Sequence, residues 1–257
     1  MQAKPLILIT NDDGITASGL RALIEVVRPL GRIVIVAPDK PQSGTSHSVT
    51  MHHPLRLKKI RSESGYVEYS SNGTPADCIK LAYKIILKRK PDLLISGINH
   101  GSNSSINIIY SGTMAAVFEG AMAGVPSIGF SLLEFGTDAD FSAAKLYAGR
   151  IIREVMSKKL PEGICLNVNI PYVPASDIKG IRICRQAGGT WLEDFDIRKD
   201  PKGEAYYWLK GVFARIGDGE DTDEYALEHK YVSIVPVNFD FTDYPAINEL
   251  KQWNFSS

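Results

Sequence analysis

The strongest constraint on the fold is a pair of short, wholly apolar runs separated by an amphipathic segment. Residues 6–9 read Leu-Ile-Leu-Ile and residues 33–37 read Ile-Val-Ile-Val-Ala, which is typical of strands buried on both faces. Between them, residues 20–27 place Leu, Leu, Ile and Val at helical spacing. A strand, a helix and a strand within about 30 residues form a βαβ unit, so a parallel sheet is expected.

The alternation of strands and helices continues to residue 169 after one long interruption. Residues 40–72 are predicted to be a long loop that carries a hairpin, because two segments, 49–57 and 66–71, have rough period-two patterning. A helix is then predicted from Thr74, where an N-cap residue is followed by proline and a carboxylate. The following patterns predict a strand at 92–96, a helix from about 113 to 123, a strand at 127–131, a helix at 140–156 and a strand at 164–169. This order predicts an α/β fold with a mostly parallel sheet and helices on both faces.

The last third of the chain is β-rich instead of alternating. Residues 181–185, 205–209 and 231–237 are predicted strands separated by polar loops. We therefore interpret residues 1–175 as the catalytic α/β region and residues 176–257 as a β-rich C-terminal lobe or oligomerisation arm. We expect the two parts to form one integrated domain.

Composition excludes several classes of partner. The 257 residues carry 29 basic and 29 acidic side chains, so the formal net charge is zero, which argues against nucleic acid and against a charged membrane surface. The three cysteines are far apart and have no zinc-site spacing, so neither a disulfide framework nor structural zinc is expected. The apolar run at the amino terminus is too short for a signal peptide, and residues 115–133 are interrupted by Glu, Gly and Pro. We expect a cytoplasmic protein that does not enter a membrane.

Polar side chains follow several of the predicted strands. Asp12 and Asp13 follow the first strand, Ser43 lies in the loop after the second, and Asn99 follows the strand at 92–96. Ligands of open parallel sheets bind beyond the carboxyl ends of the strands, so these residues are candidates for one site. A simple turn is an equally good interpretation of Asn-Asp-Asp-Gly taken alone.

The residue types at this candidate site indicate a particular kind of cation. Two adjacent carboxylates repel one another unless a cation lies between them. Asp12 and Asp13 with the Ser43 hydroxyl and the Asn99 carbonyl would form an all-oxygen site, which suits magnesium, manganese or calcium better than zinc or copper. His47 and His100 lie nearby in sequence, but loop histidines are more often surface residues or neighbours of a ligand.

A second candidate feature is the sequence Ser111-Gly112-Thr113 ahead of a helix rich in small residues. Free backbone N–H groups, hydroxyls and the positive end of the helix dipole could bind an anion there, although a simple N-cap explains the same residues. The chain has no P-loop, no Gly-x-Gly-x-x-Gly after a strand and no Gly-x-Ser-x-Gly. These absences disfavour P-loop nucleoside triphosphatases, standard dinucleotide-binding domains and α/β hydrolases.

Taken together, five ordered motifs resemble the SurE (survival protein E) family of metal-dependent 5′-nucleotidases. The motifs are residues 10–15, residues 37–39 with 42–44, residues 73–78, residues 96–99 with Gly101 and Asn103, and residues 110–113. Weaker similarity continues through residues 167–171, 222–223 and 231–234. The resemblance implies a Rossmann-like α/β domain and a β-rich C-terminal part that exchanges arms in homodimers or homotetramers.

The resemblance also implies roles for individual residues. One divalent cation per subunit, magnesium or manganese, would be held by Asp12, Asp13, Ser43 and Asn99. Asn103 and the turn Ser111-Gly112-Thr113 would lie near the substrate phosphate. Asp12 or Asp13 would act as general base or as nucleophile, and the sequence does not decide between these roles.

One departure from the family pattern is visible. The family continues after the metal-binding asparagine as Gly-x-Asn-x-Gly-x-Asp, whereas this chain has Ser105 and Asn107 in place of the glycine and the aspartate. The loss of an aspartate makes the site less anionic by one charge, and the loss of a glycine affects the conformation open to the loop.

The expected reaction is hydrolysis of a nucleoside 5′-monophosphate to nucleoside and phosphate, with 3′-monophosphates and short polyphosphates as further possible substrates. A haloacid-dehalogenase-type phosphatase is a rival, but that class needs Asp-x-Asp and Gly14 occupies the place of its second aspartate. A rival of another kind is a nucleotide-binding regulatory module without turnover, which the changes at Ser105 and Asn107 make conceivable.

Overall fold

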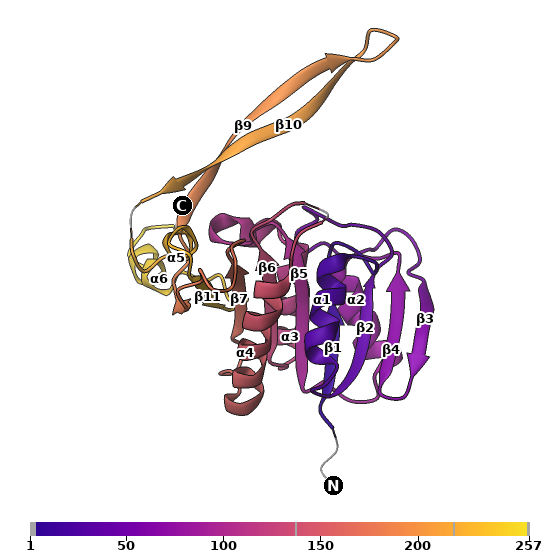
Figure 1. Cartoon of the computed structure of the whole chain (residues 1–257). Helices are drawn as coiled ribbons and strands as arrows, with labels where there is room; N and C mark the ends of the chain where they lie inside the picture. Colours follow the sequence, from indigo (N-terminus) through magenta and orange to yellow (C-terminus); the bar gives the residue numbers. More distant parts are fainter. Residues whose placement is uncertain (1–3, 137, 218, 256–257) are drawn as a thin grey trace.

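The computed structural model describes residues 4–136, 138–217 and 219–255. Its centre is a nine-stranded sheet (Figure 1). The strands of this sheet are β1 (Leu6–Thr10), β2 (Arg32–Pro38), β3 (Leu57–Glu63), β4 (Tyr66–Ser71), β5 (Leu93–His100), β6 (Ser127–Leu132), β7 (Cys165–Ile170), β8 (Ile181–Ile183) and β11 (Val232–Val237). The helical elements are α1 (Ser18–Val27), α2 (Pro75–Leu81) with the π-helical turn η1 (Ala82–Ile86), the 3₁₀ helix η2 (Ser105–Tyr110), α3 (Gly112–Met122), α4 (Ser142–Lys158), α5 (Asp223–Glu228) and α6 (Tyr244–Leu250).

The strand order is β3-β4-β2-β1-β5-β6-β7-β11-β8. The six strands from β4 to β7 in this order are parallel to one another, whereas β3 pairs antiparallel with β4 and β11 pairs antiparallel with β7. From β1 the chain first builds the sheet outward through β2 and β4, and it then returns to the other side of β1 to add β5, β6 and β7. The gap between the carboxyl ends of β1 and β5 is therefore the topological switch point, where sheets of this kind bind ligands.

Helices cover both faces of the sheet, because successive side chains of a strand point to opposite faces. Ile7 and Ile9 of β1 belong to the core under α1 and α4, whereas Leu6 and Leu8 belong to the core under α2 and α3. This arrangement explains why the parallel strands have no polar alternation, since both faces are covered by helices. The predicted α/β architecture with helices on both faces is confirmed.

Outside the long hairpin described below, three parts of the sequence prediction differ from the structure. The first strand of the predicted hairpin at 49–57 is wrong, because the strand before β4 is β3 at Leu57–Glu63. β3 is an edge strand that is largely exposed, so it carries no apolar alternation to recognise. The strand predicted at 92–96 extends to His100, with an irregular register between Ser96 and Asn99. Helices α5 and α6, each short, were not predicted.

A long hairpin extends away from the sheet (Figure 1). It consists of β9 (Gly188–Lys199) and β10 (Ala205–Ile216), which pair antiparallel over their whole length. Only part of β10 was predicted, and β9 was not predicted, because most side chains of both strands are exposed. Strands β8 and β11, which flank the hairpin in sequence, join the edge of the main sheet beside β7.

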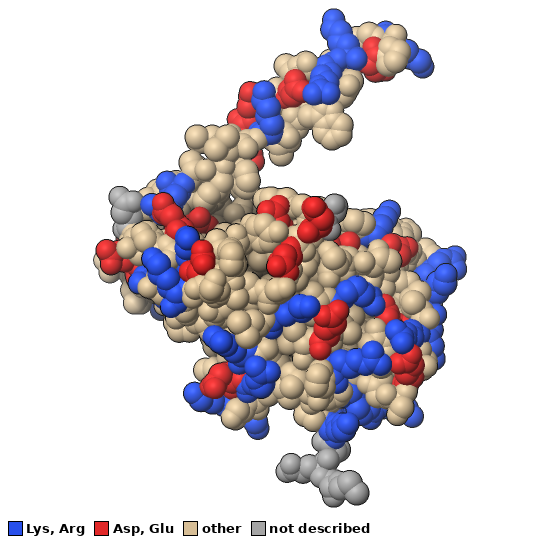
Figure 2. Space-filling model, viewed as in Figure 1, with Lys and Arg blue, Asp and Glu red and all other residues tan. Residues whose placement is uncertain are grey.

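The surface carries charges of both signs. Figure 2 shows Lys and Arg side chains interspersed with Asp and Glu over the face in view and over the outer part of the hairpin. This distribution agrees with a formal net charge of zero. Among the described residues, no helix combines the length and the apolar character needed to cross a lipid bilayer.

Candidate active site

Asp12 lies two residues after the end of β1 at the switch point and is almost wholly buried, with 4% of its surface exposed. The Thr113 hydroxyl donates a hydrogen bond to its Oδ1 atom. Burial, followed by the charge of Asp13, raises the pKa of Asp12 to about 6. Within the described part of the chain, no lysine or arginine offsets this charge. A buried carboxylate next to a second one is an environment that favours a bound cation.

Asp13 connects the end of β1 to the end of β5. Its Oδ2 atom accepts a hydrogen bond from the backbone N–H of His100 at 3.1 Å. Burial raises the pKa of Asp13, and the His100 N–H partly opposes that rise. The imidazole of His100 points elsewhere, because it contacts Ser18 and lies edge-on to Phe141. The end of β5 therefore contacts Asp13 through the backbone N–H of His100 and not through the imidazole.

Asn99 lies on β5 one residue before that contact and is buried (8% exposed). Its amide Nδ2 atom donates to the carbonyl of Gly101 at 2.8 Å, which leaves the Oδ1 atom as the group available to a ligand. The sequence prediction that Asn99 and the two aspartates share one edge of the sheet agrees with the pairing of β1 and β5, in which Thr10 lies opposite Ser96.

Ser43 belongs to an exposed loop that is tied to Asp12. The backbone N–H of Gln42 donates to the backbone carbonyl of Asp12 at 2.7 Å, so Ser43 follows the point of contact by one residue. Further along the loop, the Ser46 hydroxyl donates to the carbonyl of Ile109 at 2.7 Å, and the His47 ring bonds Glu119 at 2.8 Å. The loop is thus fixed at both ends of the segment that carries Ser43.

The turn Ser111-Gly112-Thr113 forms the start of α3 against Asp12. Ser111 is the N-cap, since its hydroxyl accepts the N–H of Met114 at 3.0 Å. A Cβ atom on Gly112 would lie 2.9 Å from the Cβ of Asp12, so glycine is what allows the helix start to approach the carboxylate. The simple N-cap interpretation is therefore correct for Ser111 but incomplete, because Thr113 and Gly112 also contact Asp12.

Asn103 is buried near the carboxyl ends of β6 and β7. Its Nδ2 atom donates to the Ser131 hydroxyl at 2.8 Å, and its backbone N–H donates to Oδ1 of Asn169 at 2.8 Å. One amide hydrogen of Asn103 remains available for a ligand. The roles of Ser131 and Asn169 were not predicted, although a polar side chain within an otherwise apolar, doubly buried strand is a signal for such a role.

The two residues that depart from the family pattern, Ser105 and Asn107, have defined structural surroundings. Ser105 keeps a left-handed backbone (φ 52°), which is the conformation that favours glycine. Asn107 accepts a hydrogen bond from Nε1 of Trp191 on the hairpin at 2.9 Å. Trp191 also packs edge-on against Phe213, so it serves packing and hydrogen bonding at the base of the hairpin.

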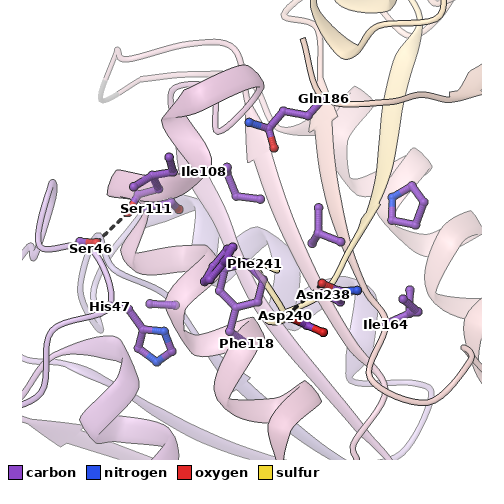
Figure 3. A pocket seen from close by; sticks show the side chains of 14 residues that line it. Ser46, His47, Ile108, Ser111, Phe118, Ile164, Gln186, Asn238, Asp240 and Phe241 are labelled. Carbon is purple, nitrogen blue, oxygen red and sulfur yellow. Dashed lines mark hydrogen bonds between the residues drawn. The ribbon is translucent and has the colours of Figure 1, made fainter. Parts of the chain in front are cut away.

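A cavity of about 580 Å³ adjoins the first turns of α3. Figure 3 shows Phe118 and Phe241 near its middle, with their ring centroids 6.4 Å apart, and Ser46 and Ser111 at one side. The apolar part of its lining comes from η2, α3, the end of β11, Ile164 and Phe241. The cavity lies beside the candidate site and shares Ser111 with it.

The chemistry of the donor set tests whether a metal fits here. The candidate ligands offer two carboxylates, one amide oxygen that is free of hydrogen bonds to its own loop, and one exposed hydroxyl. The described residues include no group of three or more His, Cys, Asp or Glu suited to a metal ion. A site with two carboxylates and neutral oxygen donors suits Mg²⁺ or Mn²⁺, which keep several water ligands. The residues therefore fit a hard divalent cation.

Fold and site together define a class of protein. It is a doubly wound α/β protein with an acidic, all-oxygen site at the switch point of a parallel sheet and the start of a helix facing that site. The model of the family described as "Survival protein SurE" matches residues 7–193 of this chain. The chain belongs to the SurE family, as the sequence motifs predicted.

Relatives extend this likeness over nearly the whole chain. The chain is 54% identical over 255 residues to the 5′-nucleotidase SurE of Flavobacterium psychrophilum, covering 99% of each protein. It is 51% identical over 255 residues to the 5′-nucleotidase SurE of Cytophaga hutchinsonii, covering 98% of each. The crystal structure of the SurE protein from Aquifex aeolicus is similar with a TM-score of 0.82 and 38% identity, over 96% of this chain and 98% of that one.

Proposed function

We propose that this protein is a divalent-metal-dependent 5′-nucleotidase, which hydrolyses nucleoside 5′-monophosphates to nucleoside and inorganic phosphate. The names of its full-length relatives support the nucleotidase activity. The observation that carries the proposal is the buried Asp12 carboxylate, which the Thr113 hydroxyl and Gly112 contact at the switch point of the sheet. One site thereby offers a cation-binding carboxylate and the anion-binding start of a helix.

Asp12, Asp13, Asn99 and Ser43 would hold one Mg²⁺ or Mn²⁺ ion. When bound, such an ion polarises phosphoryl oxygens and lowers the pKa of a water molecule. The Thr113 hydroxyl fixes the rotamer of Asp12, because it donates to Oδ1. The His100 N–H does the same for Asp13. These two contacts orient the carboxylates before any substrate enters, which lowers the reorganisation that the reaction requires.

The start of α3 would receive the phosphate. The backbone N–H of Gly112 precedes the first hydrogen bonds of the helix, that of Thr113 is directed to the Asp12 carboxylate, and the helix dipole favours negative charge at this end. The second amide hydrogen of Asn103, which is not bonded to Ser131, would add a side-chain donor. Water attacks phosphorus, the bond from phosphorus to the ester oxygen breaks, and that oxygen leaves with a proton. Asp12 or Asp13 would accept the proton of the attacking water and return it to the departing ester oxygen.

The assembly proposed for the protein is a homodimer or homotetramer joined through the C-terminal part. The support is the hairpin, whose exposed apolar side chains include Leu192, Leu209 and Val212. A two-stranded hairpin gains little stability by itself, and apolar patches of this kind mark interaction surfaces.

The decisive experiment is inorganic phosphate release from a panel of nucleoside 5′-monophosphates, 3′-monophosphates and short polyphosphates. Each substrate is tested with Mn²⁺, with Mg²⁺ and with excess chelator. The expected result is release from 5′-monophosphates that the chelator abolishes. Binding of nucleotide without release from any substrate would contradict the proposal and favour the regulatory module.

A further inference from the structure

The loop that carries Asn103 (residues 101–107, the Asn103 loop) is held on its outer side by a buried carboxylate far away in sequence. Asp223 at the start of α5 has no exposed surface. Its Oδ2 atom accepts the backbone N–H of Ser105 at 2.8 Å, and its Oδ1 atom accepts the N–H of Ala187 at 2.8 Å and of Glu224 at 2.9 Å. One carboxylate thereby connects the Asn103 loop to the residue that precedes the hairpin.

Ser105 makes a second connection between the same two segments. Its hydroxyl donates to the carbonyl of Ala187 at 3.0 Å, so the backbone of Ala187 is bound both by Asp223 and by Ser105. The left-handed conformation of Ser105 is sparsely populated by residues with a side chain, and these hydrogen bonds offset its cost. A Cβ atom on Gly189 would lie 2.7 Å from the Ser105 hydroxyl, which shows how closely the two segments approach.

A third connection lies at the other end of the loop, between Asn107 and Trp191. The indole N–H of Trp191 donates to Oδ1 of Asn107 at 2.9 Å. The hairpin root (residues 187–191) thus contacts the Asn103 loop at both of the positions where the sequence departs from the family pattern. In addition, the Ser104 hydroxyl donates to the carboxylate of Glu224 beside Asp223.

The inner side of the Asn103 loop faces the ends of β6 and β7. Nδ2 of Asn167 donates to the carbonyl of Asn103 at 2.8 Å, in addition to the contacts of Asn103 with Ser131 and Asn169. The loop therefore lies between the rigid edge of the sheet and the hairpin root. A shift of the hairpin root would displace Ser105, and through Ser105 and Ser104 it would displace Asn103.

We propose that Asp223 is a positioning residue for the reaction, and that with the Asn107–Trp191 bond it makes the hairpin root determine where Asn103 meets the substrate phosphate. The assignment of the phosphate to Asn103 rests on the proposed function. The physical basis is the buried carboxylate itself, since charge-assisted hydrogen bonds to backbone N–H groups are short and strong, and their loss leaves buried donors unpaired.

The principal test compares the full-length protein with Asp223→Asn. The variant keeps the size of the side chain but places an amide N–H₂ where a backbone N–H now donates. We expect KM for the 5′-monophosphate to rise about tenfold, as for the loss of one charge-assisted hydrogen bond, while kcat falls less than threefold. The rise in Tm on adding Mn²⁺ is expected to stay unchanged, because the candidate metal ligands lie elsewhere. A purely structural role would lower Tm and the folded fraction but leave KM of the folded enzyme unchanged.

A milder variant keeps the proposal testable if Asp223→Asn fails to fold. Trp191→Phe retains an aromatic ring against Phe213 but removes the N–H that bonds Asn107. We expect an increase in KM of about threefold and faster hydrogen exchange at the amides of residues 103–107. Trp253→Phe is the matched control, because Trp253 lies outside the hairpin with 57% of its surface exposed, and neither KM nor exchange should change.

Hydrogen exchange separates failure of this inference from failure of the proposed function. If the wild-type protein releases no phosphate from any nucleotide, faster exchange of the Asn103 loop in Trp191→Phe still supports the connection to the hairpin root. Unchanged exchange and unchanged KM in a folded Trp191→Phe protein would overturn the inference even if the enzyme is an active nucleotidase.

Discussion

The carboxylate of Asp12 opposes folding in the metal-free protein. Its pKa is raised from 3.8 to about 6, mainly by burial and then by the Asp13 charge, so the folded protein disfavours the ionised form. The contribution of such an acid to the free energy of unfolding is complete below its ordinary pKa. This contribution is lost as the pH increases from about 4 to about 6. At neutral pH the ionised Asp12 is therefore a destabilising group that a bound cation would compensate.

Neutralising the Asp12 side chain is expected to raise the stability of the metal-free protein and to abolish its activity. Asp12→Asn should abolish metal-dependent phosphate release, because the variant loses a candidate metal ligand and a candidate base. In the presence of chelator at pH 7.5, the variant should have a free energy of unfolding higher by up to about 3 kcal/mol. This figure corresponds to the rise of the Asp12 pKa from 3.8 to about 6. Urea denaturation measures this change, and Mn²⁺ should no longer raise Tm. Full activity of the variant would contradict the role given to Asp12.

The Thr113 hydroxyl is expected to act through Asp12. Thr113→Val keeps the shape of the side chain and removes the donor to Oδ1 of Asp12. Since that hydrogen bond favours the ionised form, its removal should raise the pKa of Asp12 further and lower kcat/KM by about tenfold or more. Thr113→Ser keeps the hydroxyl and should retain most of the activity. Equal kinetics for the valine and serine variants would show that the hydroxyl has no such role.

At the scale of secondary-structure elements, the start of α2 also anchors the loop that carries Ser43. Thr74 and Asp77 form a capping box, in which the N–H of Thr74 donates to Asp77 at 2.9 Å. The same carboxylate accepts the N–H of Thr50 at 3.1 Å. Burial works against ionisation of Asp77, but the hydrogen bonds from Thr50 and Thr74 outweigh it and hold the pKa below its usual value.

This lowered pKa predicts a pH-dependent contribution to stability. The contribution of an acid with a lowered pKa is complete above its ordinary pKa of 3.8 and is lost as the pH falls through the lowered value. Asp77→Asn should therefore destabilise the protein by about 1 kcal/mol at pH 7, and the difference from wild type should shrink below pH of about 4. Urea titrations of both proteins across this range measure it. A difference that stays constant with pH would mean that the charge of Asp77 is not involved.

The elements that could be predicted from the sequence are those with one buried face or two. β1, β2 and α1 carry apolar side chains at the strand or helix period, because helices and strands bury them against each other. β3 and β9 are largely exposed, so nothing in their sequence requires a regular apolar pattern. Their pairing depends on neighbouring strands instead of on local burial.

The same physical reason applies to the candidate site. Asp12, Asp13 and Asn99 could be placed together because each follows or ends a recognisable parallel strand. The contact of Thr113 with Asp12 was not predicted, since the family resemblance implied only that residues 111–113 lie near the substrate phosphate. Asp223 could not be predicted, since its contact with Ser105 joins residues 118 positions apart in sequence through a tertiary arrangement. The roles of these residues in catalysis stay predictions.

At the scale of the whole molecule, the hairpin carries apolar surface that no other part of the described chain covers. Leu192 and Val212 lie opposite each other in the hairpin register and are 63% and 70% exposed. Side chains of this kind would be buried if a second copy of the chain packed against the hairpin. This surface underlies the predicted homodimer or homotetramer.

A charge placed in this surface should weaken the assembly. Val212→Asp would have to bury a carboxylate without a partner at the interface, so we expect the dissociation constant of the oligomer to rise at least about tenfold. Light scattering coupled to size-exclusion chromatography measures the change. Lys58→Asp, on the exposed edge strand β3 at the other end of the strand order, is the control and should leave the mass unchanged. A monomeric wild-type protein would contradict the predicted oligomer.

The length of the hairpin gives it a mechanical property. Its strands of 12 residues each extend about 40 Å from a root that is bound to the Asn103 loop. Over this length, a rotation of a few degrees at the root displaces the tip by several ångströms. Conversely, a contact that fixes the tip limits the angle through which the root can rotate. A second subunit bound to the tip would thus restrict the motion of Asn103 without contacting the candidate active site.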